Sequence, residues 1–184
     1  VVSVAMACGI SAISKEFTPF FFGQGYDACI SLIIALSPVL VVKGLSEIAR
    51  MQYLIPNHKE KIFIESVFCG AGVNFVVNWF LITRMGALGA VVGTLVAELV
   101  SCVWQYTKMN KYISCLSAIF KSMIYVVFGI VMFLAVRIIS RWFNGGIVGL
   151  FFEILIGIVT YLAMCIVYWK ITKSEISSLI KLKR

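Results

Sequence analysis

Five long apolar segments constrain the fold of this chain more than any other feature of its sequence. They cover residues 28–50, 62–83, 87–107, 118–140 and 147–169. About 20 mainly apolar residues are needed for an α-helix to cross the hydrocarbon core of a bilayer. Because no water is available there to bind backbone N–H and C=O groups, such a segment must be helical or part of a closed barrel. We predict an all-α integral membrane protein with about six transmembrane helices, the first of which, residues 1–14, is the end of a helix.

Composition supports this class and excludes others. Of the 184 residues, 61% are hydrophobic and 13% are charged, a balance far more apolar than the core of a soluble domain of this length requires. The connections between the apolar segments are too short for a water-soluble catalytic domain, so we expect no enzyme in this part of the chain. Val1 is not preceded by the basic flank of a signal peptide. We therefore expect the chain to be the C-terminal part of a longer protein.

The residue types that usually bind cofactors or metals form no recognisable pattern in this sequence. The six cysteines are scattered without a C-x-x-C pair, and the single histidine, His58, lies in a polar turn. We expect no cofactor and no metal. The net charge of +8 is explained by membrane topology, described next, and we expect no nucleic-acid partner.

Lysines and arginines alternate between the two sides of the predicted bundle. Eleven lie on one side: Arg50, Lys59, Lys61, Lys108, Lys111, Lys121, Lys170, Lys173, Lys181, Lys183 and Arg184. Four lie on the other: Lys15, Arg84, Arg137 and Arg141. Since basic flanks are retained in the cytoplasm, we predict a cytoplasmic C-terminus. The basic tail, residues 170–184, places Ile176, Leu179 and Ile180 on one face, which fits either a short helix lying on anionic headgroups or a solvated end.

Segment 28–50 carries three charged residues on one helical face. Lys43, Glu47 and Arg50 are spaced i, i+4 and i+7. Lys43 lies roughly 10 Å inside the cytoplasmic end of the helix, so it either lines an aqueous cavity or pairs with Glu47. Arg50 is close enough to the interface for topology alone to explain it. Pro38 leaves one carbonyl without its usual donor and is expected to kink the helix.

Segments 62–83 and 87–107 are predicted to form an antiparallel hairpin, because the connection around Gly86 is very short. The first places small and polar residues at steps of four, opposite Phe68, Phe75 and Trp79: Ser66, Gly70, Asn74 and Asn78. The second carries small residues at three- and four-residue spacing that allow close approach of two backbones: Gly86, Ala90, Gly93, Thr94, Ala97 and Ser101. The polar stripe either packs helices together through amide hydrogen bonds or faces a substrate.

Two further carboxylates lie inside predicted spans. Glu98 is near the middle of segment 87–107, where an unpaired carboxylate is costly. It either pairs with a cation on another helix or titrates in ion coupling. Arg137 and Glu153 lie near the outer ends of consecutive antiparallel segments, and we predict a structural ion pair between them.

An 80-residue stretch resembles the polysaccharide transporter family, the O-antigen flippases of the multidrug/oligosaccharidyl-lipid/polysaccharide exporter superfamily. The resemblance lies in the order and spacing of short motifs: Phe22-Gly23-x-x-Tyr26, Gln52-Tyr53-Leu54-Ile55-Pro56, Gly70-Ala-Gly-Val-Asn74-x-x-x-Asn78, Leu81-Ile82, Gly86-Ala-Leu-Gly89-Ala and Thr94 to Glu98. At residue 83 the chain has Thr where the family usually has Pro.

The resemblance implies one lobe of a two-lobe exporter. Residues 1–169 would be the C-terminal transmembrane lobe, facing an N-terminal lobe of the same protein across a central cavity. The implied function is translocation of undecaprenyl-diphosphate-linked oligosaccharide, a repeat unit of lipopolysaccharide O-antigen or another surface polysaccharide, across the bacterial inner membrane by alternating access. Lys43 and Arg50 would attract the diphosphate, while Gln52, Asn74 and Asn78 would bind sugar hydroxyls or hold helices together. Glu47 and Glu98 are further candidates for the substrate cavity.

Other classes remain open. A multidrug cation exporter of the same superfamily would share the lobe architecture, and its cavity should be acidic and aromatic. A membrane-embedded glycan polymerase or ligase should have a large external loop with catalytic groups. A structural subunit that transports nothing would need no hydrated cavity.

Overall fold

Helices make up nearly all of the described part of the chain, and short turns connect them. The structure is a computed structural model that describes residues 1–110, 115–140 and 147–182, with side chains described for 1–110, 123–140 and 147–173. Its elements are α1 (Val2–Phe21), α2 (Ala28–Ala49), a short π-helix η1 (Arg50–Leu54), α3 (Glu60–Met85), α4 (Ala87–Met109), α5 (Cys115–Ser140) and α6 (Ile147–Leu182). Five of them are long and apolar enough to cross a membrane: the α2–η1 segment, α3, α4, α5 and α6. The predicted all-α multi-pass membrane protein is confirmed.

Burial is inverted with respect to a soluble protein. Large apolar side chains are exposed along the helices; Phe68, for example, is 75% exposed. The buried positions include many small or polar residues, such as Ser14, Ser66 and Gln105. In a bilayer, lipid tails are as apolar as leucine, so helices associate through small residues and polar contacts rather than through large apolar ones.

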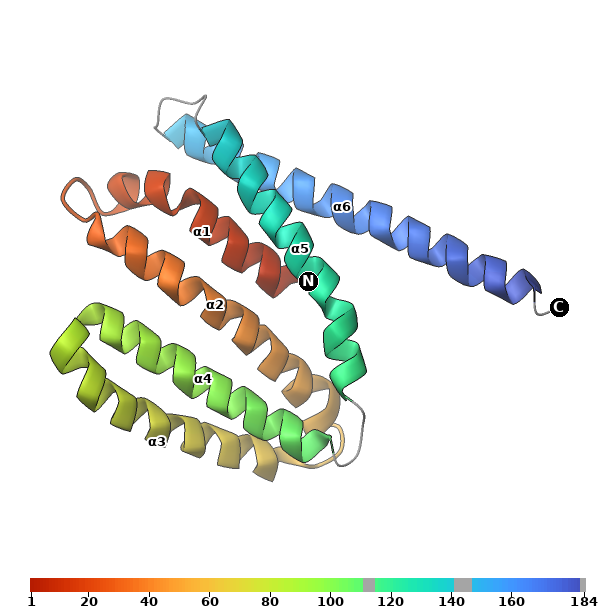
Figure 1. The fold of residues 1–184 in the computed structure, drawn as a ribbon, viewed down its shortest axis with the longest axis horizontal. Helices are drawn as coiled ribbons and strands as arrows, with labels where there is room; N and C mark the ends of the chain where they lie inside the picture. The colour runs from red at the N-terminus through yellow and green to blue at the C-terminus, as the bar shows by residue number, and fades with distance from the viewer. Residues whose placement is uncertain (111–114, 141–146, 183–184) are drawn as a thin grey trace.

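The helices pack in a row rather than around one central axis. Contacts join α3 to α4, α4 to α2, α2 to α1, α1 to α5 and α6, and α5 to α6. Figure 1 shows the α3–α4 hairpin at one end of this row and α6 at the other, with α2 lying alongside α4. As a consequence, α2, α3 and α4 together form one side of the bundle. That side carries the polar residues described below.

The α3–α4 hairpin is as tight as its sequence predicts. A Cβ atom on Gly89 would collide with the backbone of Leu81, and one on Gly93 would collide with the side-chain amide of Asn78. Gly86 has a different role from the close packing expected of it, because it forms the turn itself with φ +57 and has open space around its Cα. Two of the three glycines thus set the distance between the helices, and the third reverses the chain.

Serine side chains compensate for Pro38 inside α2. The proline has no N–H to donate to the carbonyl of Ile34, and the Ser37 hydroxyl donates to that carbonyl instead, at 2.9 Å. Ser37 in turn accepts a 2.6 Å hydrogen bond from Ser11 of α1. The helix therefore continues through the proline, and the compensating bond also joins α2 to α1.

The differences from the predicted helix boundaries that matter most concern the first, second and last helices; the other helices differ from prediction by two or three residues at an end. The first helix continues past residue 14 to Phe21 and includes Pro19. The second passes into η1 at Arg50, a change of helix type that apolar periodicity does not reveal. The last continues into the basic tail to Leu182 without a break, so the tail is helical but is not a separate helix. The predicted apolar face of Ile176, Leu179 and Ile180 lies outside the described side chains.

Candidate functional site

One groove collects most of the polar side chains that were singled out in the sequence. It has a volume of about 910 Å³ and is formed by α2, η1, α3 and α4. Its polar lining, hereafter the polar groove, consists of Lys43, Ser46, Glu47, Arg50, Asn74, Asn78, Thr83, Glu98, Ser101 and Gln105. Along α3 the lining reaches from Phe63 to Thr83, which is about 30 Å at 1.5 Å per residue. A hydrocarbon core is about as thick.

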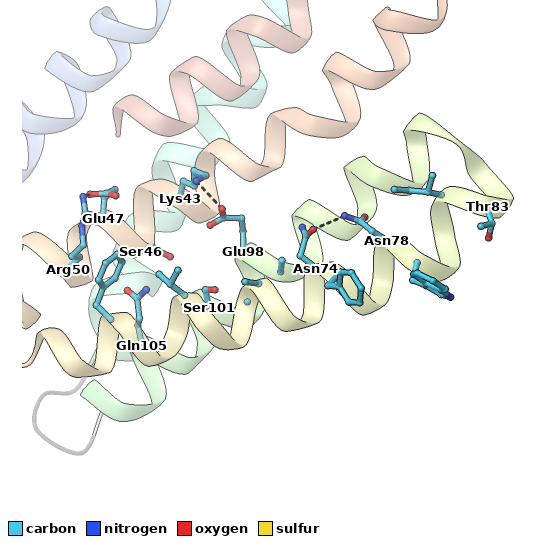
Figure 2. A pocket seen from close by; sticks show the side chains of 18 residues that line it. Lys43, Ser46, Glu47, Arg50, Asn74, Asn78, Thr83, Glu98, Ser101 and Gln105 are labelled. Atoms are coloured by element: carbon cyan, nitrogen blue, oxygen red, sulfur yellow. Dashed lines mark hydrogen bonds and ion pairs between the residues drawn. The ribbon is translucent and has the colours of Figure 1, made fainter.

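The charged residues of the groove form two ion pairs. Lys43 Nζ lies 2.9 Å from Glu98 Oε1, so α2 and α4 are linked across the groove. Glu47 pairs instead with Arg50, on its own side of the groove, and the Arg50 guanidinium lies 5.0 Å from the centre of the Phe63 ring. The alternative pairing of Lys43 with Glu47 is therefore not observed. For Glu98 the structure shows the first of the two predicted roles, a partner on another helix (Figure 2).

The two asparagines of α3 have different surroundings. Asn78 Nδ2 donates to Asn74 Oδ1 at 2.6 Å within the same helix, and the Asn78 amide lies against Gly93 of α4. Asn78 is thus part of the helix interface as well as of the groove wall. Asn74 accepts from Asn78, and its own Nδ2 has no hydrogen-bond partner among the described side chains. Figure 2 shows the two amides turned toward one another and joined by this bond.

A buried hydrogen-bonded cluster joins α3 to α4 at the floor of the groove. The Ser101 hydroxyl donates to the Ser66 carbonyl at 2.9 Å, and Gln105 Nε2 donates to the Ser66 hydroxyl at 2.9 Å. Gln105 is only 1% exposed, and its Oε1 has no partner. Gln105 was missed in the sequence. It continues the stripe of Ala97 and Ser101 at a further step of four, and that spacing is a signal that could have found it.

Gln52 is the one predicted site residue that lies away from the others. It belongs to η1, is exposed and does not line the groove. Counting at 100° per residue places Gln52 about 180° from Lys43 around the helix axis. Helical spacing therefore already places Gln52 on the side of the α2–η1 segment opposite Lys43, and the structure agrees.

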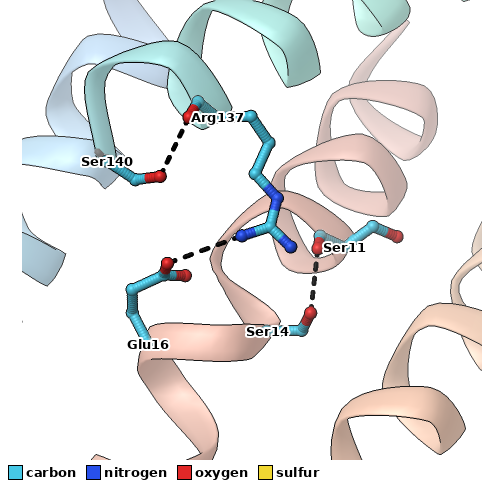
Figure 3. Close-up of polar contacts among 5 residues, drawn as sticks. All are labelled: Ser11, Ser14, Glu16, Arg137 and Ser140. Carbon is cyan, nitrogen blue, oxygen red and sulfur yellow. Dashed lines mark hydrogen bonds and ion pairs between the residues drawn. The ribbon is translucent and has the colours of Figure 1, made fainter.

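Arg137 pairs with a different carboxylate from the one predicted. Its guanidinium lies 3.5 Å from Glu16 Oε1 on α1 (Figure 3). The predicted partner, Glu153, does not form this ion pair. Glu153 is 1% exposed, and its Oε2 has no hydrogen-bond partner. The predicted Arg137–Glu153 pair is wrong because α1 extends beyond residue 14 and brings Glu16 within reach of Arg137. This cluster lies outside the polar groove.

The polar side chains that line the groove offer charges and hydrogen-bonding groups. It contains two cations and two carboxylates, so its charge sums to zero, and its cations are already held by protein partners. Within the described part of the chain, no three His, Cys, Asp or Glu side chains gather as metal ligands. A charged ligand would have to exchange places with a carboxylate or a cation of the groove.

Comparisons with known proteins return no relative for this chain: no family model, no curated protein and no solved structure matches it.

Proposed function

We propose that the chain is one lobe of a flippase for lipid-linked oligosaccharides in the bacterial inner membrane, with its C-terminus in the cytoplasm. One observation supports this most: Lys43 and Arg50 face the same groove as Asn74 and Gln105, in a chain whose other exposed faces are largely apolar. The diphosphate and sugars of such a substrate are strongly hydrated, and they cross hydrocarbon only along a path that offers cations and hydrogen-bonding groups.

The ion pairs of the groove provide a way to bind and release a diphosphate. In the structure, Glu98 pairs with Lys43 and Glu47 pairs with Arg50. The Lys43 side chain is 59% exposed, so its ammonium group is free to turn from Glu98 to a phosphate oxygen. Charged hydrogen bonds of this kind are stronger than neutral ones. Return of the carboxylates to the cations would favour release on the far side.

The open shape of the groove fits a molecule with two lobes. A groove on one bundle exposes its ligand to lipid on the opposite side, whereas a second lobe facing it would enclose a hydrated path. Alternating access then requires the two lobes to rock about the ligand. The N-terminal lobe is accordingly a partner in this proposal, as are the lipids around the bundle.

A multidrug cation exporter is the second candidate, and two observations favour it. The carboxylates of Glu47 and Glu98 lie in the groove, and so do the rings of Phe75 and Trp79. Carboxylates and aromatic faces attract organic cations. The two candidates therefore differ in which charges of the groove should be essential for binding.

Surface glycan provides the direct cellular test. Lys43→Ala in the full-length protein, at normal membrane abundance, is expected to lower surface glycan at least several-fold, because the diphosphate loses its most exposed cation. Lys15→Ala, which removes an exposed lysine outside the groove, is the matched control and should leave glycan unchanged. Normal glycan with Lys43→Ala would remove Lys43 from the substrate path.

A further inference from the structure

The two ends of the polar groove differ in chemistry. Lys43, Glu47 and Arg50 lie toward one end, whereas the lining of α3 from Asn74 to Thr83 carries no charge (Figure 2). The neutral part offers amide groups and aromatic rings instead. A ligand with a charged portion and a neutral polar portion would thus have a preferred orientation in the groove.

Two aromatic rings belong to the neutral part. Phe75 and Trp79 both line the groove and are each 68% exposed, and their ring centroids are 6.1 Å apart at an interplanar angle of 42°. Counting along α3 predicted that both would lie opposite the polar stripe. Phe68 does lie away from the groove, although it is 75% exposed on the same helix. The groove therefore includes one part of the aromatic face of α3 and leaves another part out.

Along the helix axes, the aromatic pair lies near the level of the Lys43–Glu98 ion pair. Ser101 of α4 contacts Gly70 of α3, so one turn further out, Glu98 is level with Asn74 on the antiparallel helix. From Asn74, Phe75 and Trp79 follow within about 8 Å along the helix axis. Because Lys43, Phe75 and Trp79 line one groove, the next group of a ligand whose phosphate binds Lys43 could reach the level of these rings.

The chemistry of the neutral part fits a sugar. The C–H face of a pyranose carries partial positive charge and packs against the negative face of an aromatic ring. The hydroxyl groups at its edge need neutral donors and acceptors, and Asn74 Nδ2 has no partner among the described residues. Amides and rings together bind a sugar without the desolvation cost of an additional buried charge.

We propose that Phe75, Trp79 and Asn74 form a sugar subsite, in which the sugar next to the diphosphate stacks on the ring pair while the diphosphate lies at Lys43. This subsite rests on the proposed flippase function. It assigns a direction to the substrate in the groove: the diphosphate lies on the charged side and the sugars extend toward Thr83. It also makes the two aromatic residues determinants of affinity for the glycan rather than for the lipid.

Binding of two probes to the purified full-length protein in nanodiscs tests the subsite. The probes are undecaprenyl diphosphate and the same lipid carrying one N-acetylhexosamine. The double substitution of Phe75→Ala and Trp79→Ala is expected to weaken binding of the sugar-bearing probe about tenfold and to change binding of the sugar-free probe less than twofold. Trp79→Phe, which keeps an aromatic face, should retain most of the affinity. Phe68→Ala is the matched control and should affect neither probe.

The outcomes separate this inference from the function on which it rests. Equal weakening of both probes, or of neither, would overturn the sugar subsite while leaving the flippase proposal in place, provided that Lys43→Ala weakens both probes. Failure of the unaltered protein to bind either probe would overturn the flippase proposal and the subsite with it. Thermal unfolding of each variant checks its fold. If the double variant unfolds, the single substitutions Phe75→Ala and Trp79→Ala replace it, and each is expected to weaken binding of the sugar-bearing probe more than binding of the sugar-free probe.

Discussion

Each of the four charged side chains that line the polar groove lies against a partner of opposite sign. Lys43 is held by Glu98 and Arg50 by Glu47. In a low-dielectric environment an unpaired charge costs far more than a paired one, so these pairs allow the charges to exist before a ligand arrives. In the proposed flippase, a charged ligand would therefore exchange places with one member of an ion pair rather than meet an unpaired charge.

Glu153, unlike these four residues, is a buried acidic residue without an observed ion pair among the described residues. Its side chain is buried, lies within the electrostatic influence of Glu16 and Arg137, and has one oxygen without a partner. Glu153→Gln keeps the shape and removes the charge, so we expect an unchanged or higher unfolding midpoint in detergent. Glu16→Gln removes the carboxylate partner of Arg137 and should lower the free energy of unfolding by about 1 to 3 kcal/mol.

Comparison of these two variants at one pH and in one detergent is the necessary control, because both remove a single carboxylate from the same cluster. Equal losses of stability would show that Glu153 has a stabilising partner that the structure does not provide, and would contradict this account.

At the scale of helices, the α3–α4 hairpin depends on contacts that tolerate no side chain at one position. A Cβ on Gly89 would meet the carbonyl of Leu81, and a backbone atom cannot move aside as a flexible side chain can. Gly89→Ala should therefore lower the free energy of unfolding by about 1 to 3 kcal/mol. Denaturant or thermal unfolding in micelles measures the change.

Gly72 supplies the opposite case on the neighbouring helix. A Cβ there would meet nothing within 4 Å, and alanine has the higher helix propensity, so Gly72→Ala should stabilise by about 0.5 to 1 kcal/mol. If both variants shifted stability in the same direction, close packing of the hairpin would not be its main constraint.

The sequence predicted helices well because a bilayer demands long apolar runs, and only a helix or a closed barrel satisfies the backbone there. It also predicted the hairpin, since Gly86 leaves no room for any arrangement but an antiparallel one. The partner of Lys43 was not predictable in the same way. Spacing fixes which face of its own helix a residue occupies, but the rotation and register of α4 against α2 are set by packing, and they decide that Glu98 is the partner.

The aromatic residues of α3 also show that residue spacing alone does not predict which side chains line the groove. Phe68, Phe75 and Trp79 share one face by spacing, yet only Phe75 and Trp79 line the groove. The groove crosses the helix obliquely because α2, α3 and α4 all contribute to it. Helical counting alone assigns each helix one side that faces protein and one side that faces lipid along its whole length.

For the whole molecule, the alternation of basic residues predicts which ends of the helices face the cytoplasm. We expect the connection between η1 and α3 to be cytoplasmic and the connection between α1 and α2 to be external. In a background without the native cysteines, Gln24→Cys in intact cells should react with a membrane-impermeant thiol reagent. Asn57→Cys should react only after the membrane is permeabilised. The reverse labelling pattern would invert the topology and place the charged end of the groove on the outside.

Binding measurements on two charge substitutions test whether the polar groove holds an anionic lipid headgroup through Lys43. Undecaprenyl diphosphate is titrated into the full-length protein, its Lys43→Ala variant and its Glu98→Gln variant, with a hydrophobic organic cation titrated in parallel. We predict that Lys43→Ala weakens binding of the diphosphate about tenfold, the loss of one charged hydrogen bond. Glu98→Gln should strengthen it, because the lysine loses its competing carboxylate. If the diphosphate does not respond to either substitution while Glu98→Gln abolishes binding of the organic cation, the flippase assignment is contradicted and the groove belongs to a cation exporter.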